Sequence, residues 1–264
     1  MNIFFLSGFP RAGNTLLSSL LNQNPAIGTT PNSLVMEIMH RIDSLEEDEV
    51  FRTYPDRESL DGVLNIVFSS YFKKWKYKYI IDRVAAGTPG NLKLLKKYLK
   101  QQIKIIVLVR PLLEVLASFI KWANKEPTAF LHQKGTTVDR QCEWLMASGG
   151  KIDSEIVNLN NLLRRENRHF PLFINYCDLV NEPQKILDQI YRFLEIPSYK
   201  HHLNKISQFK VNKVSYDDSY LGKGLHHLRS QIKIQKTDVH KLLPPETIIK
   251  YEHLKWNIIK DETL

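Results

Sequence analysis

A short apolar run, followed by a glycine loop and a helical pattern, is the feature that most constrains the fold of this chain. Residues Ile3–Ser7 form the apolar run, and Gly8 and Pro10 end it. Leucines then recur at helical spacing over Asn14–Asn22. This order predicts a strand, a loop that contains glycine, and a helix. The chain therefore opens with the layout of a phosphate-binding loop.

Strand and helix patterns alternate along the rest of the chain. The nearly continuous run of Ile, Val and Leu at Ile103–Val109 is typical of a strand buried on both faces of a parallel sheet. Such alternation implies crossover connections, with ligands at the carboxyl ends of the strands. We therefore expect one three-layer, P-loop-like α/β domain over residues 1–264, with a central, mainly parallel sheet flanked by helices. The other predicted strands and helices are, in chain order, Tyr79–Ile81, Gly90–Gln101, a helix from Pro111, Pro171–Tyr176 and Gln184–Leu194.

The stretch Tyr199–Lys236 differs from the segments before it. It is polar, rich in His and Lys, and only weakly periodic, which predicts a long loop region. Loops of this length within a compact domain are often functional lids. We therefore expect residues 199–236, called the closing segment below, to close over a bound ligand.

The chain is basic, with 37 Lys and Arg residues against 28 Asp and Glu residues and a net charge of +9. This charge favours anionic ligands such as nucleotides, sulfated products, nucleic acid or an anionic membrane surface. The two cysteines, Cys142 and Cys177, are too few for a disulfide framework or a zinc site and fit a reducing compartment. The sequence shows no signal-peptide pattern and no apolar stretch near the roughly 20 residues that cross a bilayer. We expect a cytoplasmic protein.

The loop Gly8–Thr15 has the glycine spacing of a Walker A loop, but Asn14 stands where that loop carries its phosphate-binding Lys. Backbone N–H groups at the helix start can still hold an anion, and Thr15 adds a hydroxyl donor. A triphosphate would lose its main point charge without the Lys. Arg11 instead supplies a cation within the loop, so the pattern favours an anion site over a plain tight turn.

The segment Gly8–Pro25 resembles the 5′-phosphosulfate loop of the sulfotransferases that use 3′-phosphoadenosine 5′-phosphosulfate (PAPS). It is especially similar to tyrosylprotein sulfotransferases and to short bacterial and phage homologues. The resemblance implies that the chain transfers the sulfuryl group of PAPS to a hydroxyl or amine of an acceptor and releases 3′-phosphoadenosine 5′-phosphate (PAP). The residues that it assigns to the 5′-phosphosulfate are Arg11, Ala12, Gly13, Asn14 and Thr15.

Three further segments carry the same resemblance. Arg110 ends a predicted strand and Ser118 follows eight residues later, and the family holds the 3′-phosphate with such a pair. Tyr176 resembles the tyrosine that contacts the adenine in this family. Part of the closing segment resembles the portion that closes over the nucleotide in related enzymes. Its candidates for contacts with the donor phosphates are Lys223, His227, Arg229 and Lys233.

Sulfuryl transfer needs in-line approach and a stabilised leaving oxygen, and Arg11 is the cation expected beside that oxygen. The transferred group carries less charge than a phosphoryl group and no acidic motif resembles a Mg²⁺ site, so we expect no metal. A general base must take the proton of the acceptor. Asp82 is the first candidate because it ends a strand, and Glu37 and His40 on a predicted helix are the alternatives. Asn32 stands where tyrosylprotein sulfotransferases carry a catalytic Glu, which argues against tyrosine as the acceptor.

Arg83 follows Asp82 directly and is a candidate to neutralise the sulfuryl oxygens. Two other function classes stay open on sequence grounds. A nucleotide kinase would share the loop and the sheet, although Asn14 and the lack of a clear Mg²⁺ carboxylate argue against it. A protein that binds nucleic acid or polyanions fits the net charge and the aromatic residues at positions 75, 77 and 79 among lysines. The sequence names neither the acceptor nor the oligomeric state.

Overall fold

The central sheet has five parallel strands in the computed structural model, which describes residues 1–208, 210–226, 228–232 and 237–254. In chain order the strands are β1 (Asn2–Gly8), β2 (Ile27–Thr29), β3 (Tyr79–Arg83), β4 (Ile105–Val109) and β5 (Pro171–Asn175). Their order across the sheet is β2-β3-β1-β4-β5, and every neighbouring pair is parallel. The predicted parallel α/β fold is confirmed, and the carboxyl ends of all five strands meet at one edge.

Close packing of β1 against β4 requires a glycine where β1 ends. Phe5 in β1 and Ile105 in β4 are fully buried, since helices cover both faces of these central strands. Gly8 has a φ of 137°, and a Cβ atom there would lie 2.2 Å from the carbonyl oxygen of Leu108. No side chain fits at that distance, so glycine allows the chain to leave the sheet directly beside β4.

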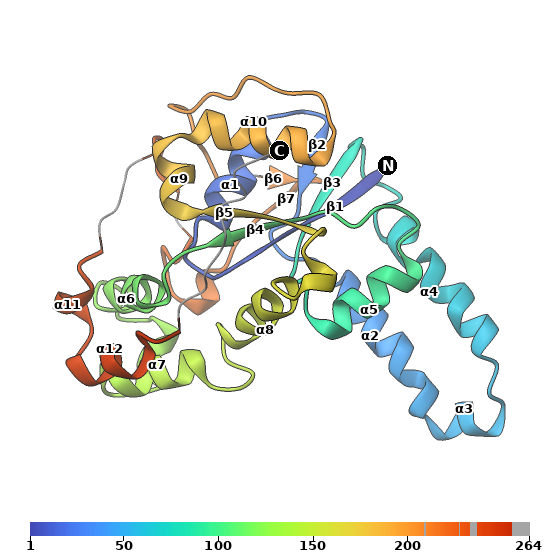
Figure 1. Ribbon diagram of the computed structural model, residues 1–264, viewed down its shortest axis with the longest axis horizontal. Helices are drawn as coiled ribbons and strands as arrows, with labels where there is room; N and C mark the ends of the chain where they lie inside the picture. Colours follow the sequence, from blue (N-terminus) through green and yellow to red (C-terminus); the bar gives the residue numbers. More distant parts are fainter. Residues whose placement is uncertain (209, 227, 233–236, 255–264) are drawn as a thin grey trace.

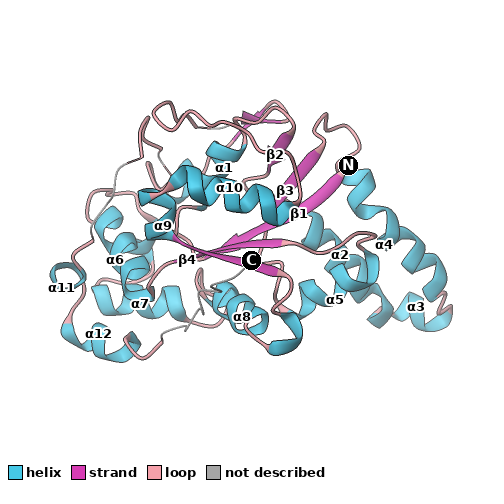
Figure 2. Ribbon diagram, turned by 45° about the horizontal axis from the view of Figure 1, so that its top comes forward, coloured by secondary structure: helices cyan, strands magenta, loops and turns pink. Residues whose placement is uncertain are grey.

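Helices lie on both faces of the sheet (Figure 1). One face is covered by α1 (Asn14–Leu21) and α10 (Pro183–Leu194), and the other by α5 (Pro89–Tyr98) and α8 (Asp153–Leu162). The turned view shows the same three layers, with the strands between the two sets of helices (Figure 2). The predicted order of helices and strands thus produces the sandwich that buries the sheet.

A second group of helices lies at the end of the molecule toward which β4 points (Figure 1). Its centre is α6 (Leu112–Ala123), which follows β4 and buries most of its residues. Against α6 pack α7 (Val138–Met146), α11 (Val239–Leu242) and α12 (Pro245–Tyr251). This group forms one side of the region beyond the carboxyl ends of the strands.

A helical arm projects from the opposite end of the molecule (Figure 1). It consists of α2 (Val35–Asp43), α3 (Glu49–Thr53) and α4 (Arg57–Tyr71), with the short 3₁₀ helix η1 (Ser44–Glu47) between the first two. The side chains of Asp48 and Asp56 accept hydrogen bonds from the first turns of α3 and α4, which fixes where both helices begin.

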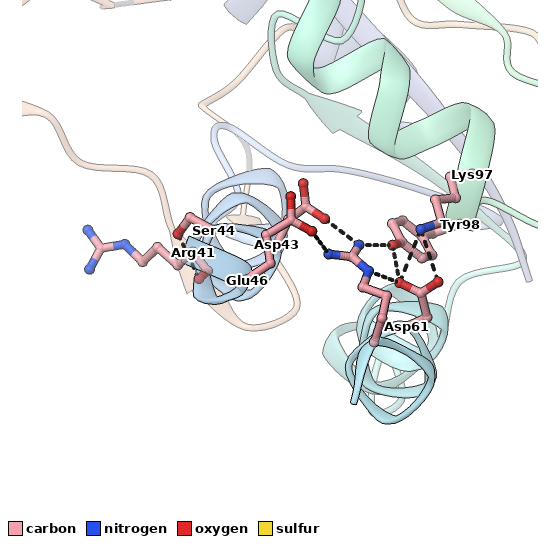
Figure 3. A network of polar contacts seen from close by, with 8 residues as sticks. Arg41, Asp43, Ser44, Glu46, Asp61, Lys97 and Tyr98 are labelled. Carbon is pink, nitrogen blue, oxygen red and sulfur yellow. Dashed lines mark hydrogen bonds and ion pairs between the residues drawn. The ribbon is translucent and has the colours of Figure 1, made fainter. Parts of the chain in front are cut away.

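Arg57 joins the arm to α5 through a cluster of polar contacts (Figure 3). Its guanidinium donates hydrogen bonds of 2.7 Å to Asp43, Asp61 and the Tyr98 hydroxyl. It also contacts the carboxylate of Glu46. These bonds raise the pKa of Arg57, chiefly through Asp43. The Arg57 cluster therefore has a structural role, and carboxylates of the chain itself neutralise the charge of Arg57.

The structure differs from the predicted elements at several boundaries. The helix predicted to reach Gln101 ends at Tyr98, because the Gln101 side chain instead bonds both backbone groups of Ile3, at 2.9 and 2.5 Å. Tyr176 begins α9 (Tyr176–Asn181) rather than ending a strand. Strand β2 is only three residues long and carries too little pattern to be predicted.

The closing segment is an irregular stretch with three short elements among its described residues. These are the hairpin strands β6 (Lys210–Val211) and β7 (Val214–Ser215) and the 3₁₀ helix η4 (Ser219–Leu221). Its long irregular course agrees with the prediction of a loop. Two more 3₁₀ helices occur among the described residues, η2 (Phe130–Gln133) and η3 (Arg165–Asn167).

Candidate functional site

A cavity of about 330 Å³ lies at the carboxyl edge of the sheet, between the loop after β1, the start of α9, α6 and the closing segment. Its described lining contains six cationic side chains and neither Asp nor Glu. Cations gathered in one concave site create a positive potential that attracts anions. The cations come from segments far apart in the sequence: Arg11, Arg83, Arg110, Lys121, Lys125 and Arg229.

The loop after β1 presents the start of α1 to this cavity. Asn14, the first residue of α1, donates hydrogen bonds to the carbonyl oxygens of Phe9 (2.8 Å) and Gly8 (3.2 Å). Its side chain therefore stabilises the loop itself, at the position where a Walker A loop would carry Lys. Gly13, Asn14 and Thr15 line the cavity, so the positive end of the helix dipole faces it.

Ala12 lies differently from the rest of the loop. Its side chain is fully buried, and it is absent from the described lining of the cavity. Its backbone N–H donates to the carbonyl oxygen of Phe9 at 3.1 Å. That N–H is thus used within the loop, and the groups that face the cavity begin at Gly13.

Arg11 extends from this loop into the cavity with a backbone φ of 67°. Its Nε donates to the Ser118 hydroxyl at 3.2 Å, and its terminal nitrogen contacts the carbonyl oxygen of Leu225. Burial, and after it the nearby charge of Arg110, lowers the pKa of the Arg11 guanidinium to about 10. Arg11 is still a cation at neutral pH, but two neighbouring cations repel, and a bound anion would relieve that repulsion.

Arg110 and Ser118, the pair that the family resemblance singled out, both line the cavity. The Arg110 guanidinium donates to the carbonyl oxygen of Arg11 at 2.9 Å and to the Thr237 hydroxyl at 3.1 Å. It also pairs with Glu114 one turn into α6, at 3.1 Å. Because Arg11 bonds both Ser118 and, through its carbonyl, Arg110, the two expected phosphate subsites adjoin.

Tyr176 lines the same cavity. The Arg110 guanidinium lies 4.5 Å from the centre of its ring. A Cβ atom at Gly13 would lie 3.1 Å from a carbon of the same ring, so glycine makes room for it. An aromatic ring beside two cations is a suitable platform for a nucleobase.

The closing segment contributes further residues to the cavity. Leu225, His226 and Arg229 line it, whereas Lys223 is exposed and is absent from the described lining. Lys223 instead uses its backbone, whose carbonyl accepts a 3.0 Å hydrogen bond from the Trp122 indole. Two of the predicted phosphate contacts, His227 and Lys233, lie outside the described residues.

Two lysines of the cavity were not predicted. Lys121 and Lys125 follow Ser118 by three and seven residues, so all three lie on one helical face and its continuation. That spacing was available in the sequence, but only the position of α6 beside the loop shows that this face meets an anion site.

His226, Asp218 and Tyr216 form a polar group that sequence reasoning missed. The Nδ1 atom of His226 contacts the Asp218 carboxylate and lies 3.1 Å from the Tyr216 hydroxyl. Burial, and after it the charge of Arg83, lowers the pKa of His226 to about 4. Burial also lowers the pKa of Arg83, which Tyr216 and Glu155 partly offset. Segment 216–226 thus places the neutral imidazole of His226 in a cavity that is lined by cationic side chains.

The structure does not bring the three predicted general bases to this cavity. Asp82 is fully buried and accepts hydrogen bonds from the hydroxyls of Thr30 (2.7 Å) and Ser33 (2.8 Å), and burial raises its pKa. Glu37 is exposed and pairs with Arg41 on the surface of α2. His40 lies on the same helix, with Nε2 2.7 Å from the Asn91 side chain. None of them belongs to the described lining.

In the described parts of the chain, no three His, Cys, Asp or Glu side chains lie close enough together to hold a metal ion. No described helix has both the length and the apolar character needed to cross a membrane. The predicted absence of a metal stays a prediction. The two cysteines are free thiols, with Cys142 buried and Cys177 exposed.

The family model of the sulfotransferase domain matches residues 2–246. The sulfotransferase domain from the curacin biosynthetic pathway is 18% identical with a TM-score of 0.58, over 96% of this chain and 97% of that one. Mouse sulfotransferase SULT7A1 complexed with PAP is 15% identical with a TM-score of 0.57, over 96% and 81%. The sulfotransferase domain from the Synechococcus PCC 7002 olefin synthase is 18% identical with a TM-score of 0.53, over 97% and 96%. No curated protein sequence matches the chain.

Proposed function

The chain belongs to the sulfotransferase family, whose reaction is sulfuryl transfer, and we propose that its donor is PAPS bound in the cation-lined cavity. The observation that carries this proposal is the pair of neighbouring guanidiniums, Arg11 and Arg110, beside the amino terminus of α1. Their mutual repulsion in a buried site favours a ligand with two separate anionic groups. PAPS has such groups at the 5′ and 3′ positions of its ribose.

The proposed donor position follows the residues of the loop. Gly13, Asn14 and Thr15, at the start of α1, surround the 5′-phosphate, and Arg11 faces the sulfate and the bridging oxygen. The carbonyl of Leu225, which Arg11 contacts in the free protein, supports this assignment because it shows that Arg11 reaches across the cavity. Ala12 contributes by shaping the loop rather than by contact with the ligand.

Arg110 and Ser118 are proposed to hold the 3′-phosphate, with the adenine against Tyr176. Ser118 bonds Arg11 in the free protein at 3.2 Å, so donor binding exchanges that bond for one to phosphate. Arg229 is proposed as a further phosphate contact from the closing segment, because it lines the cavity. Lys223 and Lys233 remain candidates on the resemblance alone.

The proposed chemistry is a direct in-line displacement. The acceptor oxygen or nitrogen attacks sulfur, the bond between sulfur and the bridging oxygen breaks, and the electron pair remains on the 5′-phosphate of PAP. Arg11 stays charged at neutral pH and is positioned to stabilise that developing negative charge. The acceptor supplies a hydroxyl or an amine, and its proton must pass to a base.

The test is isothermal titration of the purified chain with PAP, with AMP, and with ATP plus Mg²⁺. We expect micromolar binding of PAP, at least tenfold weaker binding of AMP because it lacks the 3′-phosphate, and no Mg²⁺-dependent preference for ATP. Transfer from ³⁵S-labelled PAPS to a panel of tyrosine peptides, saccharides, phenols and amines then identifies the acceptor class. Tight ATP binding without PAP binding would contradict the donor assignment.

We also propose that the protein acts in the cytoplasm. The free thiols Cys142 and Cys177 are compatible with a reducing compartment. Fractionation of source cells, with antibody detection of the chain, tests this location, and recovery in an extracellular or membrane fraction would contradict it.

A further inference from the structure

His226 differs from the six cationic side chains of the described cavity lining, because burial keeps its imidazole neutral at neutral pH. It projects from the closing segment, and its side chain is only 16% exposed. Among the described residues, its hydrogen bonds go through Nδ1, to the Asp218 carboxylate and the Tyr216 hydroxyl. Nδ1 is therefore held by the protein, and Nε2 has no hydrogen-bond partner within the described part of the chain.

The partner of Nδ1 determines the tautomer of this imidazole. A carboxylate can only accept hydrogen bonds, so Nδ1 carries the ring proton toward Asp218. Nε2 then has a lone pair and can accept a proton. Asp218 is only 15% exposed, so this orientation is maintained in a site with little access to water.

The charges around His226 keep its imidazole in the neutral form, with Nε2 unprotonated. Arg83 from the end of β3 and Arg11 from the loop after β1 both disfavour a second positive charge on the ring. Asp218 and Tyr216 face it from its own segment, and Glu155 on α8 faces Arg83. Burial and the two arginines outweigh the Asp218 carboxylate, which explains why the pKa of His226 falls to about 4.

We infer that His226 is the general base of sulfuryl transfer, and that Asp218 is the positioning residue that orients its ring. This inference rests on the proposed function, since Arg11 is the side chain assigned to the sulfate. Nε2 takes the proton of the acceptor hydroxyl or amine while the acceptor atom bonds to sulfur. The bond from sulfur to the bridging oxygen breaks, and its electron pair leaves with PAP. The proton on His226 then passes to solvent.

The position of His226 relative to Arg11 supports this role. Arg11 contacts the carbonyl oxygen of Leu225, the residue directly before His226, so a sulfate held by Arg11 would lie near the imidazole. The negative charge of the donor also offsets the fields of Arg11 and Arg83. Donor binding therefore raises the pKa of His226 toward its ordinary value, and the imidazole becomes a stronger base only when PAPS is present.

The variant that tests the role is His226→Gln, with His253→Gln, at an exposed position, as the matched control. Two quantities are measured: the Kd for PAP by titration, and the release of sulfate from ³⁵S-labelled PAPS, with water as an acceptor that needs no identification. We expect a Kd within threefold of the parent and a fall in kcat of about 100-fold or more, because general bases contribute roughly 10²–10⁴-fold. Asp218→Asn is expected to lower kcat by about tenfold.

A structural role for His226 is separated from a catalytic one by the pH profile. The parent rate should fall at low pH as Nε2 is protonated, and the His226→Gln variant should lose that acidic limb. Unchanged kcat and an unchanged pH profile in His226→Gln would overturn the inference while leaving the donor assignment intact. Failure of the parent chain to bind PAP would instead overturn the proposed donor.

Nuclear magnetic resonance of ¹⁵N-histidine gives a readout independent of turnover. We expect His226 to be neutral at pH 6, protonated on Nδ1, and to titrate at a higher pH when PAP is bound. A proton on Nε2 in the free protein, or a titration that PAP does not shift, would contradict the assignment even if the parent chain released no sulfate.

Discussion

Two sets of arginines in this molecule have opposite surroundings. Arg57 contacts three carboxylates and a tyrosine hydroxyl, and these raise its pKa (Figure 3). Arg11 lies in a cavity whose described lining contains no carboxylate, and burial together with Arg110 lowers its pKa to about 10. Carboxylates of the chain neutralise Arg57. In the cavity, much of the positive charge can be neutralised only by an anionic ligand.

This difference separates a structural arginine from a binding arginine by physical criteria. A partly exposed guanidinium surrounded by acids contributes modestly to stability, because solvent screens it. Buried guanidiniums that face one another destabilise the free protein and gain most when an anion arrives. The comparison therefore predicts that substitutions in the two regions affect different measurements.

The largest effect is expected for Arg11→Ala. Loss of a buried cation from the 5′-phosphosulfate subsite should weaken PAP binding by about 100-fold, measured by titration calorimetry, with the melting temperature unchanged or raised. Arg41→Ala, at an exposed position on α2, is the control and should bind PAP as the parent does. If Arg11→Ala bound PAP normally, the cavity would not be an anion site of the kind proposed.

Arg110→Ala should weaken PAP binding by about 30-fold. The more specific result is a loss of the preference for PAP over AMP. The variant should bind the two nucleotides about equally if Arg110 holds the 3′-phosphate. Parallel titrations of both nucleotides measure this. A variant that still prefers PAP by the parental ratio would show that the 3′-phosphate binds elsewhere.

Glu155→Gln tests a carboxylate that lies behind the cavity. Burial raises the pKa of Glu155 to about 7, although Arg83 and the Gly8 N–H, 3.2 Å away, oppose this. A carboxyl pKa raised in the folded state means that folding favours the protonated form, so its contribution to stability is lost as pH rises from about 4.5 to about 7.

The free energy of unfolding of Glu155→Gln, relative to the parent, should therefore increase by on the order of 2 kcal/mol between pH 4 and pH 8. Urea unfolding at several pH values measures it. A difference that does not change with pH would mean that folding leaves the pKa of Glu155 at its ordinary value, so that an ionised carboxylate lies behind the cavity at neutral pH.

The smallest effect is expected for Arg57→Ala. Removing the centre of the Arg57 cluster should lower the free energy of unfolding by about 1 kcal/mol, since its side chain is 30% exposed. PAP binding should stay at the parental value. Urea unfolding in low and high salt, with Arg52→Ala as a control on the same arm, measures this contribution. A loss of PAP affinity would remove the distinction between the two regions.

The sequence by itself determined the parts of the site that belong to single βα units. A parallel strand followed by a helix places its connecting loop at the carboxyl edge of the sheet. The loop at Arg11 to Thr15 could therefore be predicted from local order and spacing, whereas the pair Arg110 and Ser118 was predicted from its resemblance to the family motif.

Only the tertiary structure decided which side chains of other segments join them. Side chains alternate along a strand, so Arg83 faces the cavity while its neighbour Asp82 turns to the opposite side, toward Thr30 and Ser33. His226 and Asp218 come from a segment with almost no periodic pattern, and its path across the cavity depends on long-range contacts such as that between Arg11 and Leu225. Local patterns specify elements, whereas the meeting of distant segments depends on how those elements pack.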